Sequence, residues 1–332
     1  MKSPEVSVIV PVYRQHMSLG WLLAALSAQD CREPFEILVC DDGSFAGHVS
    51  QLEHAASRWG LDVRYVWQAR EGHRVSRSRN NGIHLARGRL LVFLDGDMVP
   101  PPDFLSRHLQ AHAGSRRLVS GTRRWVFLPQ GDQPAADPDI YAMLLPVSEV
   151  VDQWDQFRLA CSSQPWLACL GCNLSVPRAN EAMFDEMFTG WGFEDREFAC
   201  RMVLRHNYEH RHLPTLSALH VVPAPREQWA ASRTGSSHEQ IVQYLAGWLR
   251  IQELFPEADF SPVSQIARCC VLDKRTGRWQ MDTSTPTRSF AQAAQETRAW
   301  WEEGRSHHER IGPDAAEDGG RHLAVSHSAG GR

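Results

Sequence analysis

Short apolar runs alternate with longer, mixed stretches through the first 125 residues of the chain. The runs predict strands at residues 6–13, 35–40, 63–67 and 90–94. Between the strands, apolar residues recur at helical spacing, which predicts helices over about 18–29, 52–59 and 76–87, the first capped by Ser18. Because strands that alternate with helices form βαβ units, we expect an α/β fold with a mostly parallel central sheet flanked by helices.

The pattern becomes less regular after these strands. It predicts a helix capped by Asp103 and a strand at 118–121, and then changes character at about Trp125. The later expected elements are a polar loop at 129–138, a helix over 139–160, a strand over 167–176, a short helix from Pro177, a helix over 196–205, a strand at 219–222, and amphipathic helices over 238–255 and 286–303. From Gly304 the apolar pattern is lost, which predicts a disordered tail. We therefore divide the chain into segments 1–125, 126–225, 226–304 and 305–332.

Two carboxylates, Asp95 and Asp97, directly follow the strand over residues 90–94. An uninterrupted apolar run of this kind is typical of a strand buried on both faces. Sheets of α/β proteins bind ligands at the carboxyl ends of their strands, and carboxylate oxygens suit a divalent cation that holds phosphates. The alternative is a solvated turn, because Asp and Gly are common turn residues.

Composition indicates a soluble globular protein, with 42% hydrophobic and 22% charged residues. The formal net charge of -4 gives no overall basic field of the kind that binds nucleic acid. No apolar run approaches the ~20 residues of a transmembrane helix, and the N-terminus lacks a signal peptide's apolar stretch. The eight cysteines are scattered, which favours reduced thiols and a cytoplasmic location; a zinc or redox role for Cys169-x-x-Cys172 is the alternative.

Acidic residues also follow the second predicted strand, as Asp41 and Asp42. No Gly-x-Gly-x-x-Gly follows the first strand, which argues against a dinucleotide site. Carboxylates at the ends of two strands of a parallel sheet instead favour a site for a nucleotide and a metal ion.

Taken together, the motifs resemble the inverting nucleotide-sugar glycosyltransferases of family 2, which have the GT-A fold, over roughly residues 5–225. In the first half they are Val-Ser-Val-Ile-Val-Pro-Val-Tyr, Asp41-Asp42-Gly43-Ser44, Arg79-Asn80-Asn81-Gly82-Ile83 and Asp95-Gly96-Asp97. In the second half, Gly190-Trp191-Gly192-Phe193-Glu194-Asp195 and the later His220 resemble the C-terminal module of galactosyltransferases and chondroitin-polymerase-type enzymes. The resemblance implies that 1–125 is the nucleotide-sugar-binding half and that 126–225 is the acceptor-binding and catalytic half. The amphipathic pattern beyond them predicts that 226–304 is a helical extension.

On the donor side, the resemblance implies that Asp42 contacts the nucleotide base or ribose, a role that Asp41 could share. A turn-forming aspartate is the alternative for either residue. Arg79 is expected to bind the diphosphate, because guanidinium groups suit phosphate oxygens. Arg74 is a weaker candidate for the same role.

For the metal, the resemblance implies that Asp97 is a direct ligand and that Asp95 touches the ribose or holds a metal-bound water. His220 matches the imidazole that galactosyltransferase-like enzymes supply, although a structural histidine is the alternative. A carboxylate with an imidazole favours Mn²⁺ over Mg²⁺.

On the acceptor side, inversion needs a base on the face of the sugar opposite the leaving diphosphate. The resemblance implies that Asp195 is this base and that Glu194 binds the acceptor hydroxyl. An acidic first turn that stabilises a helix is the alternative. Trp191, between two glycines, is expected to close over donor and acceptor as a lid, or else to be a buried anchor.

The expected function is metal-dependent, inverting transfer of a sugar from a nucleotide-diphosphate sugar, most simply a UDP-sugar, to an acceptor hydroxyl. Glycan, lipid-linked, natural-product and peptide acceptors all remain open, as does peripheral contact with the membrane. One alternative is a sugar-phosphate nucleotidyltransferase, but Pro11-Val12-Tyr13-Arg14 is not the glycine-rich loop of that class. Another is a non-catalytic sugar-nucleotide or glycan-binding module, which would be expected to carry a broken acidic motif.

Overall fold

The structure is a computed structural model of the chain, and it describes residues 3–44, 48–113, 116–149, 158–229, 237–282, 288–308 and 324–327. The chain forms two compact units. The first unit comprises Met1–Met187, Glu194–Trp229 and Leu323–Arg332, and the second comprises Phe188–Phe193 and Ala230–His322. Unit 1 therefore contains the expected half 1–125, and all of the expected half 126–225 except Phe188–Phe193.

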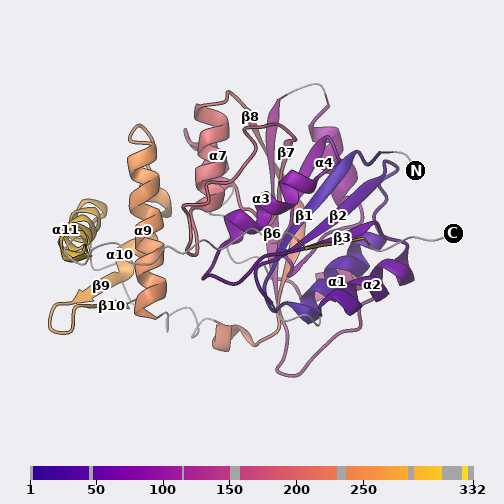
Figure 1. Cartoon of the computed structure of the whole chain (residues 1–332), viewed down its shortest axis with the longest axis horizontal. Coiled ribbons are helices and arrows are strands. Elements are labelled where there is room, and N and C mark those ends of the chain that lie inside the picture. The colour runs from indigo at the N-terminus through magenta and orange to yellow at the C-terminus, as the bar shows by residue number, and fades with distance from the viewer. Residues whose placement is uncertain are drawn as a thin grey trace. The chain divides into compact units, whose positions relative to one another are not determined.

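Half of the sheet of unit 1 is parallel, in the strand order β3-β2-β1-β4. Its strands are β1 (Val6–Val12), β2 (Phe35–Asp41), β3 (Val63–Trp67) and β4 (Leu90–Phe93), of which β1, β2 and β3 are labelled in Figure 1. Every residue of β1 and β4 is buried, as expected for central strands covered on both faces. This half of the sheet agrees with the βαβ pattern of the sequence.

Helices α1 (His16–Ser27), α2 (His48–Trp59) and α3 (Val75–Leu85) connect these strands. Because the first two crossovers step one way along the sheet and the third steps back, right-handed connections put α3 on the face opposite α1 and α2. The predicted cap of α1 was wrong: the helix begins at His16 with Gln15 as its N-cap, and Ser18 lies inside it.

In the other half of the sheet, the order continues β4-β7-β6-β8-β5, with antiparallel as well as parallel pairs. The strands are β5 (Met98–Val99), β6 (Arg117–Phe127), β7 (Leu174–Pro177) and β8 (Glu209–Val222). Helices α4 (Phe104–Ala111) and α7 (Glu194–Leu204) belong to this half. At the opposite edge, β11 (Ala324–His327) pairs antiparallel with β3.

Several expectations for the middle of the chain were wrong. In place of one helix over 139–160, α5 (Ile140–Leu144) gives way to the 3-10 helix η1 (Leu145–Val147), because Pro146 lacks the N–H that would continue an α-helix. Residues 150–157 of that prediction lie outside the described residues. The strand expected over 167–176 is the 3-10 helix η2 (Pro165–Ala168), a turn and β7, and Pro177 ends β7 rather than starting a helix.

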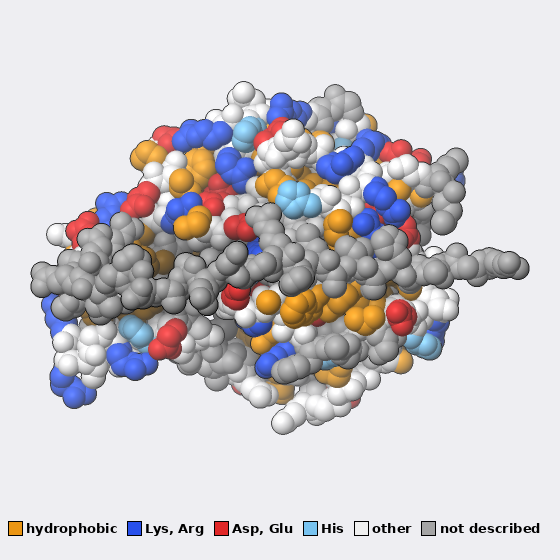
Figure 2. Space-filling view, in the orientation of Figure 1, with side chains coloured by type: hydrophobic (Ala, Val, Ile, Leu, Met, Phe, Trp, Pro, Cys, Tyr) orange, Lys and Arg blue, Asp and Glu red, His pale blue; other side chains and the backbone are white. Residues whose placement is uncertain are grey.

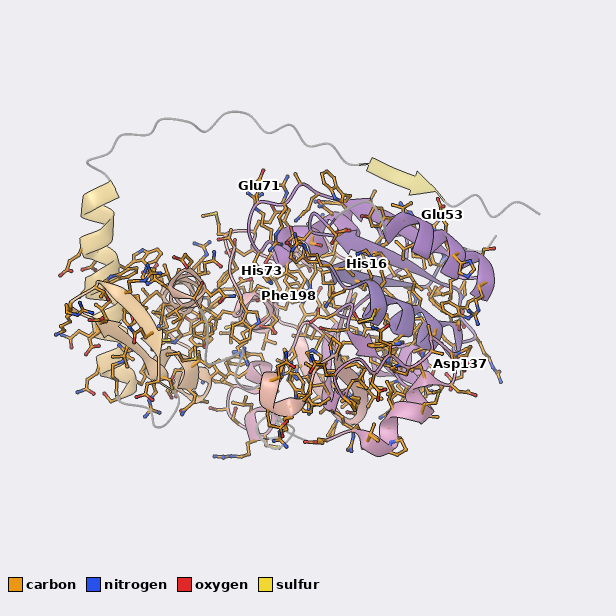
Figure 3. All side chains as sticks on the ribbon, turned by 90° about the horizontal axis from the view of Figure 1, so that it is seen from below. His16, Glu53, Glu71, His73, Asp137 and Phe198 are labelled. Atoms are coloured by element: carbon orange, nitrogen blue, oxygen red, sulfur yellow. The ribbon has the colours of Figure 1, made fainter. Side chains whose placement is uncertain are left out.

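Aromatic packing joins the parallel half of the sheet to α7. The ring of Phe184 lies 5.2 Å from that of Phe93 on β4 and 4.4 Å from that of Phe198 on α7. Phe198, labelled in Figure 3, is 0% exposed. Offset and edge contacts of this kind add to the stability that burial gives, so the cluster fixes the start of α7 near the end of β4.

A buried histidine network lies between α4, β6, β7 and β8. It consists of His108, His112, His210 and His212 with the hydroxyls of Ser120 and Ser175. His108 and His112 each lie 2.8 Å from Ser175 Oγ, and His210 lies 2.9 Å from Ser120 Oγ. Burial lowers the pKa of His108 to about 3 and that of His112 and His210 to about 4. The network is therefore built from neutral imidazoles.

Unit 2 is largely helical, with a two-stranded hairpin. Its elements are α9 (His238–Leu254), η3 (Ser261–Val263), α10 (Gln265–Cys269), β9 (Cys270–Asp273), β10 (Arg278–Met281) and α11 (Phe290–His308). Ser237 and Gln240 form a capping box at the start of α9, and the Trp248 and Trp279 side chains are fully buried. Both helices expected after residue 238 are thus present.

The surface and the tail complete the description. Basic and acidic side chains are interspersed on the face shown in Figure 2. All eight cysteines are free thiols. None of the helices that the structure describes is long and apolar enough to cross a membrane. Most of the expected tail over 305–332 lies outside the described residues, apart from the end of α11 and β11.

Candidate active site

The carboxyl ends of β1, β2 and β4 meet at one edge of the sheet because the three strands are parallel neighbours. Asp41 ends β2, and the Asp42 N–H donates to Val12 O of β1 at 2.9 Å. Beyond β4, Leu94 N donates to Ile9 O at 3.2 Å, and Asp95 and Asp97 follow. The two acidic motifs predicted from the sequence are therefore brought to the same edge.

Strand β5 brings Asp97 to His220. Met98 of β5 pairs with His220 of β8, and Val221 N donates to Asp97 O at 2.9 Å. His220 Nε2 lies 3.3 Å from Asp97 Oδ2. Burial by itself would raise the pKa of Asp97, but His220, a backbone hydrogen bond and the charge of Arg123 together lower it. The Trp125 ring stacks on the imidazole with centroids 4.3 Å apart and fixes its orientation.

The Asp97–His220 pair fits a divalent cation. Asp97 Oδ1 is buried and lacks a hydrogen-bond partner, His220 Nε2 faces the same carboxylate, and a carboxylate with an imidazole is a donor set for Mn²⁺. Within the residues that the structure describes, no group of three or more His, Cys, Asp and Glu side chains is arranged to hold a metal ion. Water and phosphate oxygens would therefore have to supply the remaining ligands.

Arg79 of α3 connects the two acidic motifs. Its Nη2 lies 3.0 Å from Asp95 Oδ1 and its Nη1 lies 3.1 Å from Glu194 Oε1, and the residue is 2% exposed. A Cβ on Gly171 would lie 2.6 Å from Arg79 Nη2, so only glycine allows this approach. The diphosphate role expected for Arg79 stays a prediction; the contacts give the same guanidinium a second role, as the counter-charge of two carboxylates.

Glu194 and Asp195 form the first turn of α7, where acidic side chains also stabilise the helix. Burial and the neighbouring Asp195 raise the pKa of Glu194 to about 7, although Arg79 acts in the opposite direction. Glu194 Oε2 is buried and has no hydrogen-bond partner. Asp195 Oδ2 accepts from Gly171 N at 3.2 Å. The pair is thus held in place, with one carboxyl oxygen of Glu194 left to accept a further hydrogen bond.

The Asp42 side chain is the centre of a polar cluster. Its Oδ1 accepts from Gln68 Nε2 at 2.7 Å, and its Oδ2 accepts from Arg74 N at 3.0 Å and pairs with Arg70. The Arg70 guanidinium lies 3.8 Å from the centroid of the Tyr13 ring. Arg74 thus reaches Asp42 through its backbone.

Asp41 is used differently. Its Oδ2 accepts from the Tyr65 hydroxyl at 2.7 Å, and its Oδ1 accepts from Ser44 N at 2.8 Å. The residue is 1% exposed. These bonds fit the alternative of a turn-forming aspartate, and any nucleotide contact by Asp41 stays a prediction.

Trp191 belongs to unit 2 rather than to the unit that contains the carboxylates. The residue is 51% exposed, and its ring lies 5.8 Å from that of Tyr244 of α9. Gly192 and Phe193, which follow it, have φ values of +91° and +72°, a backbone conformation unusual for phenylalanine. The expected lid role of Trp191 stays a prediction, whereas burial of its side chain is wrong.

A cavity of about 400 Å³ adjoins the Asp97–His220 pair. It is lined by Arg14, Gln15, His16, Met17, Ser18, Asp97, His220, Val221, Val222, Pro223 and Trp229. His16, labelled in Figure 3, is the first residue of α1. The cavity therefore opens between the start of α1 and the end of β8.

Sequence patterns missed several residues that shape this site. Gln15 contacts Asp97, Trp125 stacks on His220, and Gly171 supports both Arg79 and Asp195. Gly171 lies inside Cys169-x-x-Cys172, which was considered only as a metal or redox motif. No local signal distinguishes Gln15 or Trp125, because their partners are remote in sequence.

Comparison with known proteins relates part of this chain to one family. Residues 7–152, somewhat less than half of the chain, match glycosyl transferase family 2. Over these residues the chain resembles the family 2 glycosyltransferases. It is 32% identical over 223 residues to validoxylamine A glucosyltransferase from Streptomyces hygroscopicus subsp. limoneus, a match that covers 60% of this chain and 48% of that protein. It is also 27% identical over 248 residues to chondroitin synthase from Escherichia coli, covering 67% of this chain and 35% of that protein.

The fold of this chain is also similar to that of a solved structure. Residues 1–349 of TarS from S. aureus, solved in complex with UDP-GlcNAc, superpose with a TM-score of 0.53 at 19% identity, covering 79% of this chain and 70% of that one. The GT-A fold expected from the motifs is confirmed. The chain spans about half the length of the curated glucosyltransferases it matches.

Proposed function

We propose that this chain transfers a sugar from a nucleotide-diphosphate sugar, with a UDP-sugar the expected donor, to an acceptor hydroxyl with inversion at the anomeric carbon. The observation that carries the proposal is the link made by buried Arg79 between Asp95 of one acidic motif and Glu194 of the other. A donor motif and a base motif held by one guanidinium lie close enough to act on the same sugar. The resemblance of residues 7–152 to family 2 supports the reaction class.

On the donor side, we assign the nucleoside to the surface around Asp42 and Tyr13. Asp42 would contact the base or ribose, and the Gln68 and Arg74 contacts to its carboxylate would hold it in place. Asp95 would contact the ribose or a metal-bound water, as expected from its position two residues before Asp97. Arg79 would bind the diphosphate through N–H groups that its contacts with Asp95 and Glu194 leave available, because each terminal nitrogen carries two protons and Nε has no hydrogen-bond partner.

Asp97 and His220 would hold a divalent cation, with Mn²⁺ favoured by the imidazole. When bound, such an ion neutralises charge on the leaving diphosphate. The unpartnered Asp97 Oδ1 supports this assignment, because a buried carboxylate oxygen without a partner is costly. The stacking of Trp125 on His220 would keep the imidazole in one orientation.

On the acceptor side, Asp195 would take the proton of the acceptor hydroxyl while the hydroxyl oxygen attacks the anomeric carbon. The bond from that carbon to the diphosphate breaks on the opposite face, which gives inversion. Glu194 would orient the acceptor by accepting a hydrogen bond at its unpartnered Oε2. A positioned base of this kind contributes about 10²- to 10⁴-fold in rate.

The remaining assignments rest on sequence. Trp191 would cover the bound sugar as a lid, and the segment 226–304 would act as an accessory helical unit. The acceptor class, cytoplasmic location and peripheral membrane contact are predictions that need their own experiments.

The test is release of nucleoside diphosphate from a panel of UDP- and GDP-sugars, with and without acceptors, together with thermal stabilisation by each donor in the presence of Mn²⁺. Acceptor-dependent release of UDP with an inverted product supports the proposal. Stabilisation without release under any condition would instead indicate a binding module. Release of pyrophosphate from UTP and a sugar phosphate would indicate a nucleotidyltransferase.

A further inference from the structure

Gln15 lies beneath the turn that carries Asp95 and Asp97. Its Nε2 donates to Asp97 Oδ2 at 3.1 Å. Its Oε1 lies 2.5 Å from the point where a Cβ on Gly96 would stand, so Gly96 leaves room for the amide. Both the nitrogen and the oxygen of the Gln15 side-chain amide therefore lie against this turn.

The backbone of Gln15 is itself fixed. Gln15 is the N-cap of α1, and its carbonyl accepts from Leu19 N at 3.0 Å and from Ser18 Oγ at 3.3 Å. An amide anchored in this way presents its N–H to Asp97 from a rigid helix end. The carboxylate can then rotate only by breaking that hydrogen bond.

The contact with Gln15 gives the two carboxylate oxygens of Asp97 different environments. Oδ2 is engaged by Gln15 and lies 3.3 Å from His220 Nε2, whereas Oδ1 is buried without a partner. A carboxylate whose orientation is set before a cation arrives loses less entropy on binding, and partners of this kind typically change metal affinity by about 10- to 100-fold.

We propose that Gln15 is a positioning residue for the cation site, one that orients the Asp97 carboxylate and thereby raises its affinity for Mn²⁺. The inference rests on the proposed metal role of Asp97. Gln15 touches neither sugar nor nucleotide in this assignment; it acts through Asp97. The cavity beside it, lined by Gln15, Asp97 and His220, gives the ion a route of entry.

The test compares Gln15→Met with Gln29→Met. Methionine is close to glutamine in volume but donates no hydrogen bond, so it fills the space below Gly96 without holding Asp97. Gln29 is a matched control: it follows the same helix, donates to Pro101 O at 2.8 Å and accepts from Leu105 N at 3.0 Å, and has no contact with Asp97. Mn²⁺ affinity is measured from the electron paramagnetic resonance signal of free Mn²⁺, below the melting temperature of each metal-free protein.

We expect Gln15→Met to weaken Mn²⁺ binding by about 10- to 100-fold and Gln29→Met to leave it within about twofold. The Mn²⁺ concentration for half-maximal transfer should rise with the dissociation constant, and kcat at saturating Mn²⁺ should fall less. Unchanged Mn²⁺ affinity in Gln15→Met, with normal binding by the unmodified protein, overturns the positioning role alone. If the unmodified protein binds no Mn²⁺, both this inference and the metal part of the proposed function fail.

Discussion

Replacing Arg79 with methionine removes a buried counter-charge from two carboxylates. Removing one partner of a buried ion pair typically costs about 3 to 5 kcal/mol, because the other charge stays buried and unpaired. The Asp95 side chain is 33% exposed and can be solvated by water, whereas the Glu194 side chain is 10% exposed and cannot. We therefore assign most of the loss to Glu194 and expect about 3 kcal/mol at a pH high enough to ionise Glu194 in both proteins, a large share of a typical stability of about 5 to 15 kcal/mol.

The cost should depend on pH. Burial and Asp195 raise the pKa of Glu194 to about 7, and Arg79 opposes that rise, so the variant should have a still higher value. A carboxyl with a raised folded-state pKa contributes its full stability below its unfolded-state pKa and loses it as the pH rises through the folded-state pKa. Below about pH 6 Glu194 is protonated in both proteins and the difference should be small. Above pH 7 it should grow by up to about 1.4 kcal/mol per pH unit.

The assay is urea denaturation of both proteins at pH 6 and pH 8, with transfer activity followed over the same range. Arg79→Lys is the control, because lysine keeps the charge but cannot bridge both carboxylates with a planar fork. It should recover part of the stability and little of the activity. A stability loss under 1 kcal/mol at pH 8, or an equal loss at both pH values, would refute the view that Arg79 compensates the charge of Glu194.

The remaining predictions concern the base, the cation and the histidines. Asp195→Asn should lower kcat by about 10²- to 10⁴-fold with donor affinity unchanged, whereas Glu194→Gln should mainly weaken acceptor binding. Steady-state kinetics together with UDP titration distinguishes these two effects. A normal kcat in Asp195→Asn would mean that another residue is the base. Asp97→Ala should abolish Mn²⁺-dependent UDP binding in a folded protein, and His220→Ala should only weaken it. Calorimetric titration measures this binding, and tight binding in Asp97→Ala would contradict the cation assignment. In the buried histidine network, lowered pKa values mean that stability is retained above pH 6.5 and lost below it, by about 2 kcal/mol per histidine at pH 5. Urea denaturation at pH 7 and pH 5 measures this loss of stability. His210→Gln should reduce the loss by about the contribution of one histidine. Equal stability of the unmodified protein at both pH values would contradict the prediction.

The parallel half of the fold and its carboxylates were predictable because the signals are local. Each strand is a short apolar run, and the motif that ends it sits in the same few residues, as with Asp42 after β2 and Asp97 after β4. Parallel neighbours then bring those ends to one edge without any long-range information.

The second half was less predictable because distant contacts decide it. β7 lies antiparallel between β4 and β6, and no local pattern indicates that insertion. β5 has only two residues, Met98 and Val99, and is a strand because β8 pairs with it. The pairing of β5 with β8 brings His220 next to Asp97. The motif resemblance pointed to the histidine, but only the strand pairing shows that it lies beside Asp97.

Individual roles within a motif also needed the structure. Asp41 and Asp42 are adjacent and chemically identical, yet the Asp41 oxygens are held by Tyr65 and by Ser44 of the turn, whereas Asp42 faces the Arg70 guanidinium beside Tyr13. Neighbouring residues of an extended strand end point in opposite directions, so one of the pair turns toward the core and the other toward the edge.

The charge balance of the site favours one position for a cation. Asp42 forms an ion pair with Arg70, and Asp95 forms an ion pair with Arg79. Asp97 pairs with His220, an imidazole that is charged only when protonated, and the charge of Arg123 also acts on this carboxylate. The buried Asp97 Oδ1 nevertheless has no hydrogen-bond partner, so added positive charge beside it should lower the free energy. A divalent ion should therefore raise the melting temperature of the metal-free protein by more at pH 8 than at pH 6, because protons compete with a metal ion for its ligands.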